Sequence, residues 1–265
     1  MSCLKKLKRI NSYKISKLFD MCDSNIPIPD FDFDDYEMMS FDVPIKGSPQ
    51  CRIPCDIKEI AEYFGFKLAS DGPIKGTSNS NVYEACSINT THKCALKVCA
   101  HKYRITKEFE NFQQLPSSTY IVQSYDLFEY ENLILLQMEL CDGDIYGVML
   151  DEPAVWHLIY DVASALDVIH SSDFIHLDVS PSNILSKGDG FKLADFGTLI
   201  ESGTFEPGDE GAGPYASPEV LYYPGNQITG YHAVTPAADI FSLGVVLLEV
   251  CSGIFAPRGG NPKYD

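Results

Sequence analysis

Two short segments in the second half of the sequence bring carboxylate and amide side chains close together. Residues 176–183 read His-Leu-Asp-Val-Ser-Pro-Ser-Asn, and residues 192–197 read Lys-Leu-Ala-Asp-Phe-Gly. A phosphoryl-transfer site needs one carboxylate to accept and orient the substrate hydroxyl, a second carboxylate on a metal ion, and an amide oxygen on the other metal position. Asp178, Asp195 and Asn183 can supply these groups.

The two segments resemble the catalytic loop and the metal-binding motif of eukaryotic protein kinases. The resemblance implies that Asp178 is the catalytic residue and that Asn183 and Asp195 bind Mg²⁺. It also implies that ATP is the phosphate donor and that a protein hydroxyl is the acceptor.

A lysine on a predicted strand is expected to pair with a glutamate on the helix that follows. Lys97 lies in a β-type run where kinases place the lysine that holds the α and β phosphates of ATP. We assign Glu108 rather than Glu110 as its partner. With this choice, Leu115 and Val122 fall where apolar residues follow the glutamate in the family.

The resemblance further implies a pocket for the adenine base, with Met138 as the gatekeeper residue and Asp144 near the ribose. The residues expected around the base are Val82 and Ala95 above it, Leu185 below it, and Glu139, Leu140 and Cys141 through backbone groups at its edge. The alternative, which stays open for Asp144 above all, is that these are ordinary strand and core positions.

Two further segments follow in the order that the family has. Ser217-Pro218-Glu219 resembles the Ala-Pro-Glu that closes a kinase activation segment, and Asp239 resembles the aspartate that anchors the catalytic loop. Any one of these fragments can arise by chance at a helix end or turn. All of them in the right order make chance a remote explanation.

Residues 210–219, which read Glu-Gly-Ala-Gly-Pro-Tyr-Ala-Ser-Pro-Glu, resemble the Glu-Gly-Asp segment of the Wee family, the inhibitory kinases of cyclin-dependent kinases. The catalytic loop and residues 139–141, 195–201 and 256–260 resemble the membrane-associated Wee relative. The resemblance covers roughly residues 60 to 265. It implies phosphorylation of a tyrosine, sometimes with the adjacent threonine, in a cyclin-dependent kinase, and so a delay of mitosis at G2/M.

Leu177 stands where many kinases carry an arginine that pairs with a phosphorylated activation loop. A phosphate group orders such a loop through charge-assisted hydrogen bonds to a cation. Because leucine offers no cation, we expect no activation by loop phosphorylation.

The loop at residues 74–82 departs from the family, which has three glycines there. Lys75, Thr77 and Ser80 stand at those positions, and Gly76, one place out of register, is the remaining nucleotide-binding candidate. Glycine lets backbone N–H groups approach phosphate closely. We therefore expect a weaker or distorted grip on the phosphates.

Two more departures concern charge and length. Ser180 stands where the Wee family usually has a lysine, and loss of one such electrostatic contact costs roughly 10²-fold in rate. The sequence stops at Asp265, so we expect the last helices of the second lobe to be missing. Glu219 would then lack its usual arginine partner, which is costly for a buried carboxylate.

The order of elements predicts how these groups are positioned. Apolar β-type runs occur at residues 82–85, 94–99 and 133–140, with one helix between the second and third. Apolar residues at helical spacing follow at 155–169 and 237–251. We predict an α+β, bilobal, protein-kinase-like fold at residues 57–265, with a β-rich N-lobe at about 57–140 and a helical C-lobe at about 141–265.

Residues 1–56 differ in character, and we expect a largely disordered tail. The basic cluster of Lys5, Lys6, Lys8 and Arg9 resembles a nuclear import signal or, alternatively, an exposed basic helix end. The acidic residues 30–37, interleaved with aromatic ones, fit a docking motif or a solvated linker. The basic cluster favours the nucleus, with the cytoplasm as the alternative.

The composition limits the partners. The chain has 37 acidic and 20 basic side chains, a net charge of −17, which argues against general affinity for nucleic acid or anionic membranes. Nine scattered cysteines show no zinc-ligand spacing and are expected to be reduced thiols. We expect neither a signal peptide nor an integral membrane segment, and the oligomeric state stays open.

Three functional hypotheses remain. An active Wee-type protein kinase leads, because Lys97 and the three groups that carry the chemistry occur together. A pseudokinase that acts as a binding or scaffold module is second, supported by Ser180, the altered loop and the short C-lobe. A kinase of small molecules is last, because such enzymes rarely combine a Ser-Pro-Glu-like segment with an anchor such as Asp239.

Overall fold

The computed structural model describes residues 56–77, 80–206, 209, 211, 213–221 and 234–255. All structural statements below concern these residues. The predicted basic cluster, the acidic aromatic segment and residues 256–260 lie outside them.

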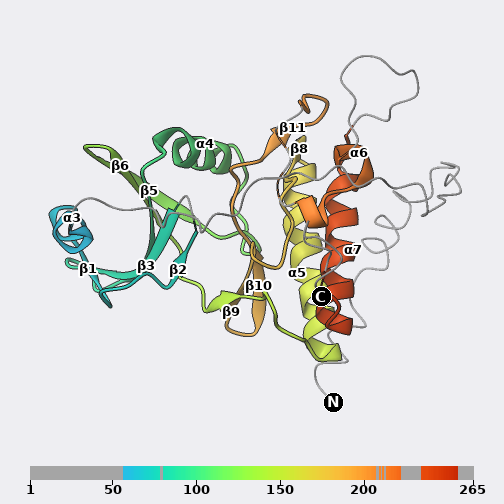
Figure 1. The fold of residues 1–265 in the computed structure, drawn as a ribbon, viewed down its shortest axis with the longest axis horizontal. Coiled ribbons are helices and arrows are strands. Elements are labelled where there is room, and N and C mark those ends of the chain that lie inside the picture. Colours follow the sequence, from blue (N-terminus) through green and yellow to red (C-terminus); the bar gives the residue numbers. More distant parts are fainter. Residues whose placement is uncertain are drawn as a thin grey trace, which may run out of the picture. The chain divides into compact units, whose positions relative to one another are not determined.

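The first part of the described chain is rich in β-structure (Figure 1). Its elements are α3 (Ile57–Tyr63), β1 (Phe66–Leu68), β2 (Lys75–Gly76), β3 (Ser80–Ser87), β4 (Lys93–Cys99), α4 (Lys102–Gln113), β5 (Ser124–Tyr130) and β6 (Leu133–Met138). The strands form one antiparallel sheet in the order β1-β3-β4-β6-β5, and β2 pairs with β3.

The register of this sheet puts four predicted nucleotide-site residues on one face. Val82 pairs with Lys97 across β3 and β4, and Ala95 pairs with Met138 across β4 and β6. Directly opposed residues share a face, and so do residues two apart on one strand. The side chains of Val82, Ala95, Lys97 and Met138 therefore share a face of the sheet.

The second part is mostly helical, with short strands between the helices. Its elements are β7 (Gly143–Asp144), α5 (Glu152–His170), β8 (Phe174–Ile175), β9 (Ile184–Lys187), β10 (Gly190–Leu193), β11 (Ile200–Glu201), a 3₁₀ turn (Gly213–Tyr215), α6 (Pro218–Leu221) and α7 (Ala237–Ser252). β7, β9 and β10 form one small antiparallel sheet, and β8 pairs with β11. Figure 1 shows the β9–β10 hairpin between the large sheet and the helices α5 and α7.

Helix α5 has a clear start and a buried stripe. The Asp151 side chain accepts a hydrogen bond from the Ala154 N–H at 3.0 Å, and Pro153 lies in the first turn, where its missing N–H costs nothing. Leu158, Val162 and Ile169 recur at helical spacing, are fully buried, and join α5 to α7 and β10 in the main core. Val179 belongs to the same core, which therefore supports the loop at residues 176–183.

The predicted order, with strands first and helices later, is confirmed, and so is the α+β fold class. Helix α3, strands β1, β2 and β5, and the short strands β7 to β11 were not predicted from the sequence. Strand β6 ends at Met138, two residues before the predicted limit, because the chain there leaves the sheet and connects to β7.

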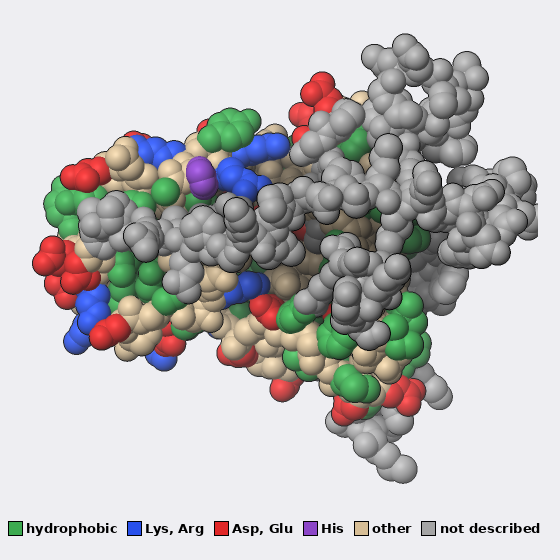
Figure 2. All heavy atoms as spheres, viewed as in Figure 1, with side chains coloured by type: hydrophobic (Ala, Val, Ile, Leu, Met, Phe, Trp, Pro, Cys, Tyr) green, Lys and Arg blue, Asp and Glu red, His purple; other side chains and the backbone are tan. Residues whose placement is uncertain are grey.

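Two surface features complete the fold. On α7 the apolar side chains of Phe241 and Leu248 are 44% and 59% exposed. Figure 2 shows acidic and basic side chains interspersed over the β-rich part of the face that it presents. Within the described ranges, no helix combines the length and the apolar character that crossing a membrane requires.

Candidate active site

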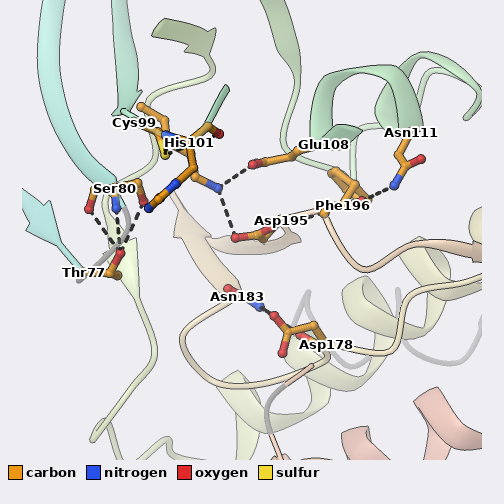
Figure 3. Close-up of polar contacts among 12 residues, drawn as sticks. Thr77, Ser80, Cys99, His101, Glu108, Asn111, Asp178, Asn183, Asp195 and Phe196 are labelled. Atoms are coloured by element: carbon orange, nitrogen blue, oxygen red, sulfur yellow. Dashed lines mark hydrogen bonds and ion pairs between the residues drawn. The ribbon is translucent and has the colours of Figure 1, made fainter. Parts of the chain in front are cut away.

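A buried lysine is the centre of the site. Lys97 Nζ lies 2.6 Å from Glu108 Oε2 and 3.1 Å from Asp195 Oδ2, so one cation joins β4, α4 and the segment after β10. Figure 3 shows the Glu108 and Asp195 carboxylates turned toward the same nitrogen atom. The expected pairing of Lys97 with Glu108 is therefore present.

The charges of this cluster influence one another. Burial alone would lower the pKa of Lys97, but the carboxylates of Asp195 and Glu108 more than offset it and raise that pKa above its ordinary value. Burial, together with the negative charge of Asp195, raises the pKa of Glu108 to about 7. Burial would also raise the pKa of Asp195, yet Lys97 holds it below the ordinary value. Lys97 and Asp195 are thus charged at neutral pH.

Helix α4 delivers Glu108 because one of its faces is buried. Ile105, Glu108 and Asn111 lie three residues apart on that face and are each less than 9% exposed. The Asn111 side-chain amide donates to the carbonyl oxygen of Phe196 at 2.7 Å (Figure 3) and to that of Leu199 at 3.3 Å. α4 is thereby tied to the chain that follows Asp195. Asn111 was not predicted as a site residue, although its spacing of three from Glu108 on a predicted helix was a signal in the sequence.

A second pair of side chains lies in the loop at residues 176–183. The Asn183 side-chain amide donates to the Asp178 carboxylate at 2.7 Å and to the Asp178 carbonyl at 2.9 Å (Figure 3). This contact fixes the orientation of the Asp178 side chain. With the nitrogen of Asn183 engaged, its side-chain oxygen is the atom left for a cation.

Asp239, on α7, anchors the same loop, as predicted. Its fully buried carboxylate accepts hydrogen bonds from the backbone N–H groups of His176 at 2.9 Å and Leu177 at 2.8 Å, and lies 2.8 Å from the His170 ring nitrogen. Leu177 has a backbone φ of 63°, which is unfavourable for a residue with a branched side chain. The two N–H contacts stabilise this strained turn next to Asp178.

Leu177 contributes apolar packing where many kinases have a cation. It is 5% exposed and belongs to a buried cluster with Ile175, Ile200, Phe205, Ala216, Val220, Val234 and Ala238. The cluster connects the loop before Asp178 to the segment before α6. Apolar contact therefore links these segments directly.

The predicted nucleotide residues surround a cavity of about 510 Å³. It is lined by Val82, Ala95, Lys97, Glu108, Met138, Glu139, Cys141, Asp144, Asn183, Leu185 and Asp195 among others. Such a volume is in the usual range for small-molecule sites. Gly76 and Asp178 do not line it, although Lys75 and Thr77, the neighbours of Gly76, do.

The turn that covers the cavity is closed by side chains in place of glycines. The Ser80 N–H donates to Thr77 Oγ1 at 3.0 Å, and the Thr77 N–H donates to the Ser80 carbonyl at 2.8 Å (Figure 3). At Gly76, an added Cβ would lie 3.0 Å from Asn81 Oδ1. The turn thus places hydroxyl groups where the family has bare backbone.

The edge of the cavity toward β6 is held by a further ion pair. Glu139 and Lys192 lie 2.8 Å apart, and the Glu139 N–H donates to the Gln123 carbonyl at 2.8 Å. The Glu139 side chain is thus engaged with β10. Its predicted role concerned backbone groups, and Cys141, two residues on, also lines the cavity.

The oxygen atoms at the cavity suit Mg²⁺. Asp195 offers a carboxylate kept anionic by Lys97, and Asn183 offers an amide oxygen, both in the lining. Mg²⁺ prefers oxygen ligands and is commonly held by one or two carboxylates together with substrate phosphates. Among the residues that the structure describes, no three His, Cys, Asp or Glu side chains form a metal cluster. The donor set therefore fits a cation bound together with a phosphate ligand.

Two other predicted features have partial outcomes. Ser180 is buried and does not line the cavity. Its side chain carries no positive charge, so the position lacks the cationic group that the family usually has. Glu219 is half-buried at the start of α6, rather than enclosed in the core. Gly211, which the sequence analysis did not single out, lies directly against Asp178.

Comparison with known proteins agrees with this geometry. Residues 75–263 match the protein kinase domain family. The chain is 30% identical over 208 residues to the mitosis inhibitor protein kinase mik1 of Schizosaccharomyces pombe, covering 71% of this chain and 34% of mik1. It is 32% identical over 173 residues to the membrane-associated tyrosine- and threonine-specific cdc2-inhibitory kinase wee-1.3 of Caenorhabditis briggsae, covering 62% of this chain and 24% of that protein.

A third relative is the mitosis inhibitor protein kinase SWE1 of Candida albicans, 30% identical over 161 residues, which cover 57% of this chain and 13% of SWE1. The chain thus spans about a third or less of the length of these three relatives. The predicted resemblance to Wee-type kinases is confirmed. With a match that covers most of its length, the chain belongs to the protein kinase domain family.

Proposed function

We propose that this chain transfers the γ-phosphate of ATP to a hydroxyl group of a cyclin-dependent kinase, as an inhibitory phosphorylation in the control of entry into mitosis. The observation that carries the proposal is the convergence at one cavity of the Lys97–Glu108–Asp195 cluster and Asn183, with Asp178 hydrogen-bonded to Asn183. These are the groups that phosphoryl transfer needs.

Each residue has a distinct task in this proposal. Lys97 binds the α and β phosphates, and Glu108 holds the lysine in place. Asn183 and Asp195 hold Mg²⁺, which neutralises the charge of the phosphates. Asp178 orients the acceptor hydroxyl and accepts its proton, and the Asn183 contact fixes the carboxylate for that task.

The strained backbone around the site supports this assignment. Leu177 and Asp195 have φ values of 63° and 65°, in the left-handed region that residues other than glycine rarely adopt. Strained conformations cluster at active sites, where the surrounding structure holds them. Here Leu177 directly precedes Asp178, the proposed general base, and Asp195 is itself a proposed metal ligand.

The names of the relatives support a proposal for the substrate. Proteins named as mitosis inhibitor kinases, and as tyrosine- and threonine-specific cdc2-inhibitory kinases, match 57–71% of this chain. We propose a tyrosine of a cyclin-dependent kinase as the acceptor, with an adjacent threonine as a second one. The basic residues 5–9 are the reason to propose that the protein acts in the nucleus.

A pseudokinase is the second candidate, and specific observations favour it. Thr77 and Ser80 fill the turn that glycines keep open in the family, and Ser180 provides no positive charge near the phosphate. Both differences slow transfer without abolishing the nucleotide cavity. Such a protein would bind ATP and a partner while transferring phosphate slowly or not at all.

A transfer assay separates the two candidates. Purified protein is incubated with Mg²⁺, ATP and a cyclin-dependent kinase, and phosphotyrosine is located by mass spectrometry. The test variant is Asp178→Asn, and the matched control is Asp126→Asn, an exposed aspartate on β5. Transfer by the wild type and the control that is lost in Asp178→Asn supports the kinase. The pseudokinase is supported if the wild type and both variants bind ATP but give the same background level of phosphotyrosine.

A further inference from the structure

Lys75 connects the large sheet to the opposite wall of the cavity. It lies on β2, and its Nζ is 2.7 Å from Asp144 Oδ2 and 2.8 Å from the Ser182 carbonyl oxygen. Asp144 belongs to β7, and Ser182 lies in the loop that carries Asp178. All three residues line the cavity. The Lys75 side chain thus joins β2 of the large sheet to β7 and to the loop at residues 176–183.

The position of Lys75 in the sheet explains its reach. Lys75 pairs with Val82, which in turn pairs with Lys97, so the three side chains share a face of the sheet. The family places a glycine at this position, and glycine has no side chain that could cross the cavity. The bridge is therefore a property of this sequence.

One of the two oxygen atoms that hold Lys75 belongs to Asp144, the residue expected near the ribose of a nucleotide. This step rests on the proposed function, ATP-dependent transfer, and on the expected place of Asp144 beside the ribose. A ribose diol needs hydrogen-bond acceptors, and here the ammonium group already occupies the Asp144 carboxylate. The sugar and Lys75 therefore compete for the Asp144 carboxylate, and binding of the sugar weakens the Lys75 contact.

The bridge is weak enough to open. The side chains of Lys75 and Asp144 are 39% and 23% exposed, so water and salt screen their attraction. Ion pairs of this kind contribute at most about 1 kcal/mol. A contact of that size reduces the affinity of a ligand a few-fold without blocking the site.

We propose that Lys75 is a latch across the nucleotide cavity, which holds Asp144 and the Ser182 carbonyl until a nucleoside displaces it. The latch couples nucleotide affinity to the state of the covering turn. It distinguishes a sugar-bearing ligand from a bare base, because the base does not need the Asp144 acceptor.

The test compares adenosine, adenine and ATP binding to wild-type protein, Lys75→Met and Lys67→Met by calorimetry. Lys67 is exposed on β1 and supplies the matched change in charge. Adenosine avoids the confounding loss of a positive charge near the phosphates. We expect Lys75→Met to bind adenosine roughly two- to five-fold more tightly than wild type, the range set by a contact of this strength. Adenine affinity stays unchanged, and Lys67→Met behaves as wild type.

Two further arms sharpen the result. In an Asp144→Ala background the gain from Lys75→Met shrinks, because its partner is absent. Raising the salt concentration narrows the difference between wild type and Lys75→Met. Equal or weaker adenosine binding by Lys75→Met contradicts the latch while leaving the nucleotide site intact. If wild type and both lysine variants bind neither adenosine nor ATP, the proposed function fails as well.

Discussion

A Cβ atom on Gly211 would lie 2.6 Å from both the Cβ and the Oδ1 atoms of Asp178. Real side chains do not approach so closely, so any residue other than glycine must push the segment before α6 or the Asp178 carboxylate aside. The backbone of Gly211 thus packs directly against the side chain of Asp178, the proposed catalytic residue.

Gly211→Ala is expected to slow phosphate transfer by about 10²-fold, because a displacement of about 1 Å at the reacting groups costs that much. The rate is measured at saturating ATP, and ATP affinity in the same preparation should stay near the wild-type value. The control is Gly213→Ala, where an added Cβ meets nothing within 4 Å. A Gly211→Ala enzyme as fast as the control contradicts the packing argument.

Asn111→Ala should destabilise the protein by about 1–3 kcal/mol, because it leaves the buried carbonyl groups of Phe196 and Leu199 without their donor. Urea denaturation measures the change in the free energy of unfolding. Gln113→Ala, an exposed substitution on the same helix, should stay within about 0.5 kcal/mol of wild type. Equal effects from the two substitutions would show that the Asn111 contacts add nothing.

The raised pKa of Glu108 predicts that the stability of the protein depends on pH. Its pKa is about 7 in the folded protein against an ordinary value of 4.5. Between these values the folded protein holds a proton that the unfolded chain has released, so the free energy of unfolding falls as pH rises from about 4.5 to about 7. Glu108→Gln should lack this part of the slope, whereas the exposed Glu110→Gln should keep it.

The same group affects the rate. Below about pH 7 Glu108 is protonated and its pairing with Lys97 weakens, so transfer should slow as pH falls through this range. Glu108→Gln should be slower than wild type and show no loss centred there. A wild-type rate profile that matches the profile of Glu108→Gln excludes a role for this ionisation.

Leu177→Arg should destabilise the fold by about 3 kcal/mol, because it places a charge in a buried apolar cluster. Leu177→Met keeps the volume and should cost less than about 1.5 kcal/mol. Thermal unfolding of the two variants gives the comparison. An arginine variant as stable as the methionine variant would mean that the cluster opens to solvent at this position.

The sequence predicted which residues lie together at the proposed site better than it predicted the contacts that hold them. Asp178, Asn183 and Asp195 stand in short motifs, and Glu108 could be assigned to Lys97 because Leu115 and Val122 follow it at the spacing of the family. These inferences depend on local order along the chain, which a sequence displays directly. The strand-then-helix order was predictable for the same reason.

The contacts that were not predicted join residues far apart in the sequence. The contacts of Lys75 with Asp144, Asn111 with Phe196, and Gly211 with Asp178 depend on how the large sheet, α4 and the segment before α6 pack against the rest of the fold. In the sequence, Lys75 differs from the family only as a lysine in place of a glycine. Its reach across the cavity follows from strand register, which no local pattern reveals.

The most direct test of the account is the rate of phosphate transfer in Lys97→Met and Asp195→Asn, with adenosine binding measured in the same preparations. We predict that both variants bind adenosine nearly as wild type does but transfer phosphate at least about 10²-fold more slowly. Variants that transfer at the wild-type rate would contradict the account. So would a wild-type protein that binds Mg²⁺ and ATP yet transfers no phosphate.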